Sequence, residues 1–224
     1  MDNNERVARH WGRRGGRWYL PGAALAVLAT GMLGCSSEPA KTAEVKTETP
    51  KKAEGPPEPV TAKTAFYAMY TPARSWASDL MALSLESGEI NGVKNADGKA
   101  GLWTAVFASP SLHQIRTYTW AAADELPNFS KGVRSQGTDP WPGPTAKAMP
   151  FQNSDFTVDS DAAYKTALEK GSSWVEKNPD KPLKMSLGAA SRFPAPVWYF
   201  LWGTTTNGYA ALINATTGNP ISGK

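Results

Sequence analysis

Residues 196–202 read Pro-Val-Trp-Tyr-Phe-Leu-Trp and decide the fold of this 224-residue chain. Aromatic and β-branched residues favour a β-strand. Successive side chains of a strand point to opposite faces, so Trp198, Phe200 and Trp202 share one face. Val197, Tyr199 and Leu201 then form the other face, which is also apolar. A strand that is apolar on both faces is predicted to lie inside a sheet, with a second layer packed against it.

The neighbouring segments extend this sheet and supply the second layer. Asp159 and Ser160 are good N-terminal caps for a helix whose apolar residues recur at helical spacing and which ends at Asn178-Pro179. Strands are predicted at 183–187 and 209–213, and a turn at 214–219.

The first half of the chain follows a similar plan. Thr71-Pro72 predicts a helix start, Leu80 and Leu83 continue its apolar face, and Ser87-Gly88 ends it. A turn at 95–99 then leads to predicted strands at 102–107 and 113–120. Trp103 and Phe107 are four residues apart, like Trp198 and Trp202, so the chain is interpreted as an internal repeat of about 90 residues. The Gly- and Pro-rich residues 124–156 are predicted to form a long loop between the halves, ordered by Trp141 and Phe151.

Residues 1–34 have the organisation of a secretory signal: arginines to Arg17, an uncharged and mostly apolar run, then small residues. The apolar run is too short and too interrupted to span a membrane comfortably. Met32-Leu33-Gly34-Cys35 resembles the bacterial lipobox. That resemblance implies cleavage before Cys35 and attachment of lipid to its thiol, with acyl chains such as palmitate that hold the chain to a membrane. The alternative is that Cys35 is an ordinary buried thiol.

Residues 35–63 are predicted to be a disordered tether. After Cys35 they contain five Lys, five Glu and several Pro, but no aromatic residue. Such a segment cannot bury enough apolar surface to offset the entropy of ordering the chain. The globular domain is therefore placed at 64–224, with repeat-like halves at 64–123 and 155–224. Ser36 beside Cys35 is compatible with the periplasmic face of an outer membrane.

The formal net charge of +4 comes mainly from the signal segment. Five arginines and two carboxylates lie in residues 1–17, which leaves 19 basic and 18 acidic residues elsewhere. A nucleic-acid partner requires a concentrated basic surface and is therefore not expected. Since Cys35 is the only cysteine, the domain can contain neither a disulfide nor a cysteine-based metal site.

Residues 159–221 resemble a PepSY-type domain. The resemblance is carried by the Ala-rich helix, Pro196–Leu201, and the sequence Ala211-Leu212-Ile213-Asn214-Ala215-Thr216-Thr217-Gly218, in which Asn214 stands where the family usually has Asp. Residues 72–120 resemble a more diverged copy. The resemblance implies an α+β fold with a helix packed on an antiparallel sheet, in two tandem units of an exported bacterial protein. The family is associated with non-catalytic roles, including proposed modulation of peptidases, and the resemblance transfers no catalytic residues.

Few residues are candidates for chemistry. His113 is the only histidine beyond the signal segment, and no nucleophile motif accompanies it. Asp155, Asp159 and Asp161 could form a calcium site or a glycosidase carboxylate pair. Their position ahead of a helix instead favours a capping role. No metal site and no cofactor are therefore predicted.

The aromatic strand allows two interpretations. Trp198 and Trp202 could form an exposed platform for a sugar, peptide or lipid. The favoured interpretation is a central strand that is covered by a helix on one face and by a loop or the other repeat on the second. Trp198, Phe200 and Trp202 then belong to the core and Tyr199 lies on the opposite face, and replacing any of the four by Ala is expected to destabilise the fold.

Taken together, the sequence predicts an exported lipoprotein, anchored to the bacterial membrane through Cys35, with a non-catalytic binding or peptidase-modulating role. Its expected partner is an envelope protein or peptide. The alternative is a secreted hydrolase that uses carboxylates alone.

Overall fold

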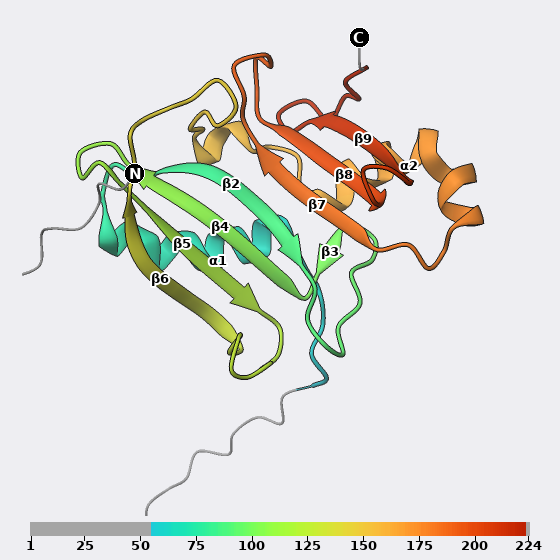
Figure 1. The fold of residues 1–224 in the computed structure, drawn as a ribbon, viewed down its shortest axis with the longest axis horizontal. Helices are drawn as coiled ribbons and strands as arrows, with labels where there is room; N and C mark the ends of the chain where they lie inside the picture. The colour runs from blue at the N-terminus through green and yellow to red at the C-terminus, as the bar shows by residue number, and fades with distance from the viewer. Residues whose placement is uncertain (1–54, 223–224) are drawn as a thin grey trace, which may run out of the picture. The chain divides into compact units, whose positions relative to one another are not determined.

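The computed structural model describes residues 55–222, and the predictions made for the signal segment, Cys35 and the tether up to residue 54 lie outside them. The described chain forms two helices on a seven-stranded antiparallel sheet, which confirms the α+β prediction (Figure 1). The helices are α1 (Ala62–Trp76) and α2 (Ser160–Lys177). In sheet order the strands are β6 (Gly132–Pro140), β5 (Gln114–Ala121), β4 (Leu102–Ser109), β2 (Met81–Gly88), β7 (Leu183–Gly188), β8 (Val197–Gly203) and β9 (Gly208–Asn214).

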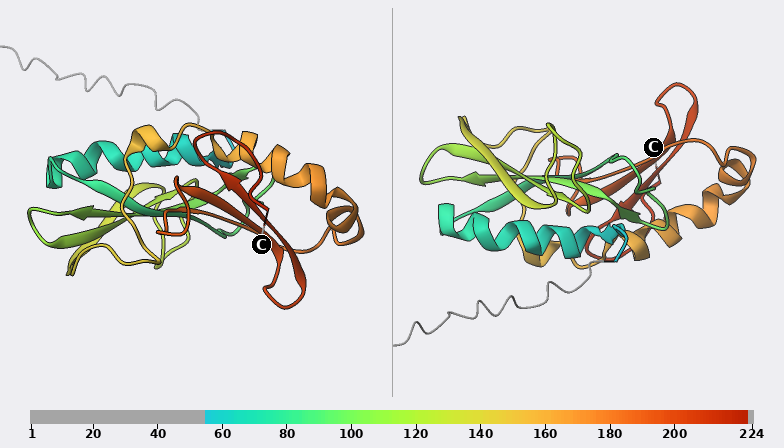
Figure 2. Two further views of the ribbon diagram at one scale, coloured as in Figure 1. Left: turned by 90° about the horizontal axis from the view of Figure 1, so that it is seen from above. Right: turned by 90° about the horizontal axis from the view of Figure 1, so that it is seen from below.

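The order of elements repeats along the chain. A helix is followed by the strands β2, β4 and β5 in the first half, and by β7, β8 and β9 in the second. The strands β2 and β7 pair in the middle of the sheet, with Leu85 opposite Leu187. Both helices lie on the same face of the sheet (Figure 2): α1 packs on β4 and β5, and α2 on β8 and β9. A short pair, β1 (Val60–Thr61) with β3 (Lys99–Ala100), lies outside the large sheet.

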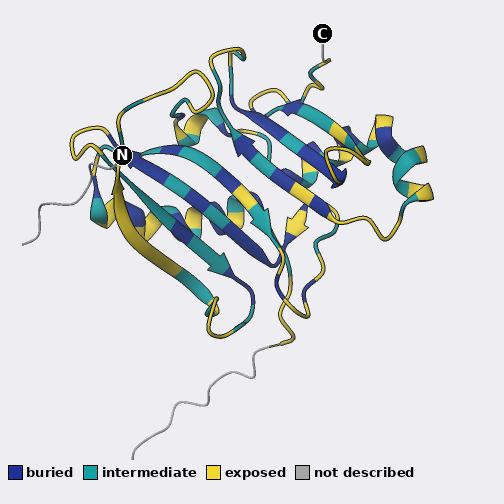
Figure 3. Cartoon of the chain, viewed as in Figure 1, coloured by how far each residue is buried: buried dark blue, intermediate teal, exposed yellow. Residues whose placement is uncertain are grey.

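The core lies between this sheet face and the two helices. Alternate residues of the central strands point into it, which produces the alternating burial visible in Figure 3. Helix α2 places Tyr164 against Phe200 and Trp202, with ring centroids 6.2 and 5.6 Å apart. Burial raises the pKa of the Tyr164 phenol, and the nearby Asp97 carboxylate adds to that effect.

Two tryptophans occupy corresponding positions in the two halves. Trp103 in β4 and Trp198 in β8 are both 0% exposed. The Trp103 indole donates to the carbonyl of Val60 at 3.1 Å, and the Trp198 indole donates to that of Val158 at 2.9 Å. Each carbonyl lies two residues before the helix of its own half. A buried indole N–H needs a partner, so each tryptophan fixes the entry of its helix relative to the sheet.

The N-termini of the two helices meet and share their caps. The Ser160 hydroxyl accepts from the backbone N–H of Ala62, and the Asp159 carboxylate accepts from that of Lys63, both at 2.9 Å. Asp159 also accepts from its own helix, from Ser160 N–H at 2.7 Å. The first N–H groups of a helix have no partner within it, and Thr61, which precedes α1, provides no side-chain cap. The start of α2 therefore caps both helices.

The first helix differs from its sequence prediction. Helix α1 begins at Ala62 rather than near Pro72, and Leu83 belongs to strand β2. The buried stripe of α1 lies earlier than expected, at Ala62, Ala65, Phe66, Met69 and Ala73. Thr71-Pro72 looks like a helix start, but Pro72 is exposed in the second half of the helix and the Thr71 hydroxyl donates to the carbonyl of Tyr67.

Two predicted boundaries also move. The predicted tether at 35–63 ends earlier, because residues 60–63 form β1 and the first turn of α1. The predicted loop at 124–156 contains strand β6, residues 132–140, at the edge of the sheet. An edge strand can expose polar residues to solvent. The sequence of β6 therefore lacks the alternation of apolar residues that predicts a strand. The other predicted strands and the Asp159-capped helix agree with the structure.

Candidate functional site

Within residues 55–222, no helix covers the second face of the sheet, which we call the open face. The register defines two of its rows. One runs Val106, Ser84, Gly188, Val197 and Asn214; the other runs Thr104, Glu86, Ser186, Tyr199 and Leu212. Most of these side chains are only partly buried, and Glu86 is exposed. The open face is therefore a broad surface of small, hydroxyl-bearing and apolar residues.

A groove crosses this face over β7 and β8, with a volume of about 410 Å³. The floor at its β8–β9 end is apolar and comes from Val197, Tyr199 and Leu212, with Phe193 beside it. Toward β2 the floor becomes polar, at Ser84, Glu86 and Ser186. The volume falls within the range of roughly 300–1,000 Å³ that is usual for binding sites.

Two connecting segments form the wall of the groove. Residues 145–149 follow β6, and residues 189–193 connect β7 to β8. Backbone hydrogen bonds join them: Met149 N–H donates to Ala189 at 2.9 Å, and Ser191 N–H donates to Ala146 at 2.9 Å. This pairing gives the wall a defined position above the sheet.

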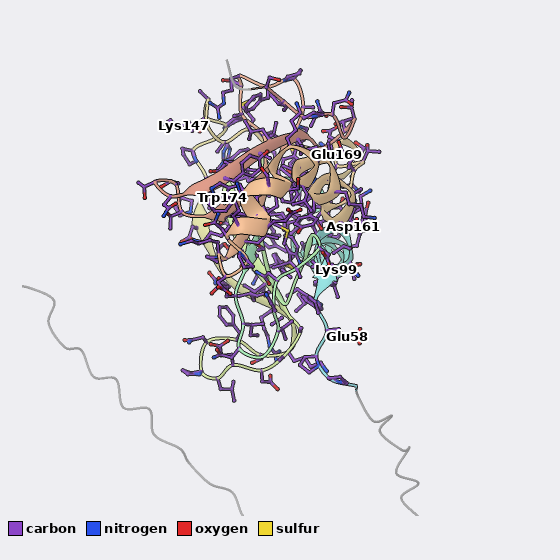
Figure 4. The ribbon with its side chains drawn as sticks, turned by 90° about the vertical axis from the view of Figure 1, so that its right-hand side faces the viewer. Glu58, Lys99, Lys147, Asp161, Glu169 and Trp174 are labelled. Atoms are coloured by element: carbon purple, nitrogen blue, oxygen red, sulfur yellow. The ribbon has the colours of Figure 1, made fainter. Side chains whose placement is uncertain are left out.

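The wall contributes two cations to the groove. Lys147 lies on the opposite side of the sheet from Asp161 and Glu169 of α2 (Figure 4). The Arg192 guanidinium stacks on the ring of Phe193, 4.6 Å from its centroid. The groove contains one carboxylate, Glu86, at its polar end. Arg192 therefore brings positive charge beside the apolar end, whereas the negative charge of Glu86 lies at the polar end.

A second cavity, of about 680 Å³, lies where β2 ends and β7 begins. Its lining is mostly polar and comes from residues 89–95 and 179–183, with Glu125. The Glu125 carboxylate accepts from the backbone and the side-chain amide of Asn91, both at 2.9 Å. This carboxylate thus holds two loops together, and the cavity has no aromatic floor.

The structure places Trp198 and Trp202 in the core, with 0% and 3% of their surface exposed. They face the helices and cannot form an exposed platform, so that interpretation is corrected. Tyr199 lies on the opposite face, where connecting segments rather than a helix lie over the sheet, and it is only partly buried and lines the groove. Cys35 lies outside the described residues.

The other candidate residues, His113 and the three aspartates, lie in a turn or hydrogen-bond the backbone next to helix starts. His113 lies at the turn between β4 and β5, with a positive φ of 52°. Asp155 forms a capping box with Gln152, Asp159 caps the helices, and Asp161 accepts from Ala162 N–H at 2.7 Å. In the part of the chain that the structure describes, no group of three or more His, Cys, Asp or Glu residues could hold a metal ion.

Sequence reasoning missed the groove because its wall comes from segments read as loops. Lys147, Arg192 and Phe193 are distant in sequence from Ser84 and Glu86, and they come together through the pairing of β2 with β7 and the hydrogen bonds of the wall segments to each other and to β2. One signal was present: Tyr199 and Leu212 fall on the face opposite the bulky Trp198 and Ile213.

Comparison with known proteins places the chain in no family. No family model matches it, and no curated protein matches it. It resembles a crystal structure from Clostridium difficile 630, described as a "putative lipoprotein", with 11% identity and a TM-score of 0.43 over 70% of this chain and 90% of that one. Among residues 55–222, neither helix is long and apolar enough to cross a membrane.

Proposed function

We propose that this chain is a lipid-anchored protein of the bacterial envelope that binds a partner protein on the open face of its sheet. The observation that carries this proposal is that, within residues 55–222, one face of the sheet holds the main core under the two helices, while no helix covers the other face, where loops form only a small apolar cluster and border a groove. Large surface areas with apolar residues at their centre are typical of interaction sites.

Two features support a binding role over a chemical one. The groove combines apolar side chains with a few polar groups, which is the usual composition of a recognition site. The acidic residues near α2, which a carboxylate hydrolase would need, are engaged in capping. The role proposed is therefore recognition of an envelope protein, for which modulation of a peptidase is one form.

The anchor is tested first. The full chain with Cys35→Ala, produced in a bacterium that processes lipoproteins, should retain residues 1–34 and carry no acyl mass, because lipid transfer requires the thiol. Wild-type chain that keeps residues 1–34 without acylation in mass spectrometry would exclude the anchor.

The binding face is tested by chemical cross-linking of the full chain in cells, followed by quantitative mass spectrometry of the captured envelope proteins. Thr119→Arg places a large charged side chain on the open face, in the row that pairs with Thr104. It should remove at least one captured protein that Glu169→Arg, on exposed α2 surface, retains. Identical captured sets for the two variants and the wild type would contradict the proposal.

A further inference from the structure

We infer that the groove over β7 and β8 binds a segment of the partner in which an apolar side chain lies next to a carboxylate. This inference rests on the proposed function and adds the chemistry of the contact. Such a segment contains an Asp or Glu beside an apolar residue.

The apolar end of the groove is the reason for inferring an apolar side chain in the bound segment. Three large side chains at this end remain partly exposed: Tyr199, Leu212 and Phe193. Burying apolar surface contributes about 25 cal/mol per Å². Binding hot spots are commonly anchor side chains that fill such pockets. An aromatic or aliphatic side chain is the occupant that gains most from this end.

The two cations of the wall are the reason for inferring a carboxylate beside that side chain. Arg192 and Lys147 both border the groove, and neither makes an ion pair within residues 55–222. The stacking of Arg192 on Phe193 restricts its guanidinium and places it next to the apolar end. A planar guanidinium binds a carboxylate through two parallel hydrogen bonds. A carboxylate adjacent to the anchor side chain would meet these cations.

The polar end favours a peptide over a lipid. Along the row from β8 to β2, the floor changes from Tyr199 to Ser186 and then to Glu86. Neighbouring strands are about 4.8 Å apart, so the carboxylate of Glu86 lies only about 10 Å along the row from Tyr199. A long alkyl chain laid along the groove would cover these hydroxyl and carboxylate groups. A single side chain fits the apolar end and leaves the polar end to the peptide backbone.

The test is a selection of random peptides on the immobilised full chain. Enriched peptides should share an apolar residue next to Asp or Glu. Arg192→Glu and Lys147→Glu should each weaken their binding by about tenfold or more, because each replaces a favourable charge with a repulsive one. Lys165→Glu, on exposed α2 surface, is the matched control and should leave binding unchanged. A peptide with its Asp or Glu changed to Lys should bind the Arg192→Glu chain better than the wild type.

Two results would overturn the inference: enriched peptides without carboxylates beside apolar residues, or binding that both charge reversals leave intact. Binding of dodecanoate with no peptide enriched would also overturn it and indicate a lipid. If Thr119→Arg abolishes capture of the partner while Arg192→Glu leaves capture and peptide binding unchanged, the groove inference fails and the proposed function stands. If Thr119→Arg also leaves capture unchanged, the proposed function fails.

Discussion

On the helix-covered face of β8, Trp198 and Phe200 are both 0% exposed, whereas Tyr199 between them is only partly buried on the open face. Neighbouring residues in β2, β7 and β9 show the same contrast. Leu85, Leu187 and Ile213 are buried under the helices, while their neighbours Glu86, Ser186 and Leu212 remain accessible. Residues one position apart thus meet different environments.

This difference indicates a division of roles within each strand. Side chains under the helices supply the apolar burial that stabilises a fold. Side chains on the open face contribute less to that burial and can therefore be chosen for recognition. The predictions below test this division, beginning with the covered face.

The largest effect is expected at the covered face of β8. Trp198→Ala removes a fully buried side chain and leaves Val158 O without the indole donor. Large-to-small changes of this kind cost about 3–5 kcal/mol, a substantial part of the ~5–15 kcal/mol that stabilises a domain. Denaturant unfolding should show this loss, and a change below about 1 kcal/mol would contradict the assignment of Trp198 to the core.

The next effect is expected where a turn packs against the start of α2. Gly98 has a φ of +76°, and a Cβ there would lie 2.5 Å from the carbonyl oxygen of Ser160. Gly98→Ala should cost about 1–2 kcal/mol for the left-handed backbone and about 1–3 kcal/mol more for the overlap. Gly92→Ala is the matched control, since Gly92 has a φ of +80° but open space around its Cβ position. Equal unfolding free energies for the two variants would show that the turn does not pack as described.

A smaller effect is expected at the shared helix cap. Asp159→Ala removes the acceptor for both Ser160 N–H and Lys63 N–H, so it should destabilise the fold by about 1–2 kcal/mol, the upper part of the range for a cap. Asp161→Ala provides the comparison, because its carboxylate accepts only from Ala162 within α2. If Asp161→Ala lowers the free energy of unfolding as much as Asp159→Ala does, the shared cap is contradicted.

The pH dependence of stability tests the contact between Asp79, which precedes β2, and Ser109 at the end of β4. Hydrogen bonds from the Ser109 hydroxyl and then from Ser111 N–H lower the pKa of Asp79 below its usual value. A carboxyl with a lowered pKa stabilises the fold above its unfolded pKa of about 3.9 and loses this contribution as pH falls through the folded pKa. The wild type should therefore exceed Asp79→Asn in stability at neutral pH, and the gap should close below about pH 4. A gap that is independent of pH would refute this linkage.

Strong local patterns allowed much of the fold to be predicted, and weak ones did not. The aromatic strand at 197–202 and the helix capped by Asp159 were predicted correctly, because tertiary contacts did not override these local sequence patterns. Thr71-Pro72 misplaced α1, because the true start of that helix is capped from α2, about 96 residues away in sequence. The groove could not be predicted, because its wall and floor meet through tertiary contacts, the pairing of β2 with β7 and the bridge between Ala82 and Phe151, that no local pattern of the sequence shows.

The most direct test of the division between the two faces compares adjacent residues of one strand. Phe200→Ala and Tyr199→Ala are each measured for unfolding free energy in denaturant and for affinity toward the peptides selected on the wild type. Phe200→Ala should lose about 3–5 kcal/mol of stability. Tyr199→Ala should stay within about 1 kcal/mol of the wild type yet bind those peptides at least tenfold more weakly. A Tyr199→Ala chain that unfolds as readily as Phe200→Ala, or that binds the peptides as the wild type does, would contradict the account.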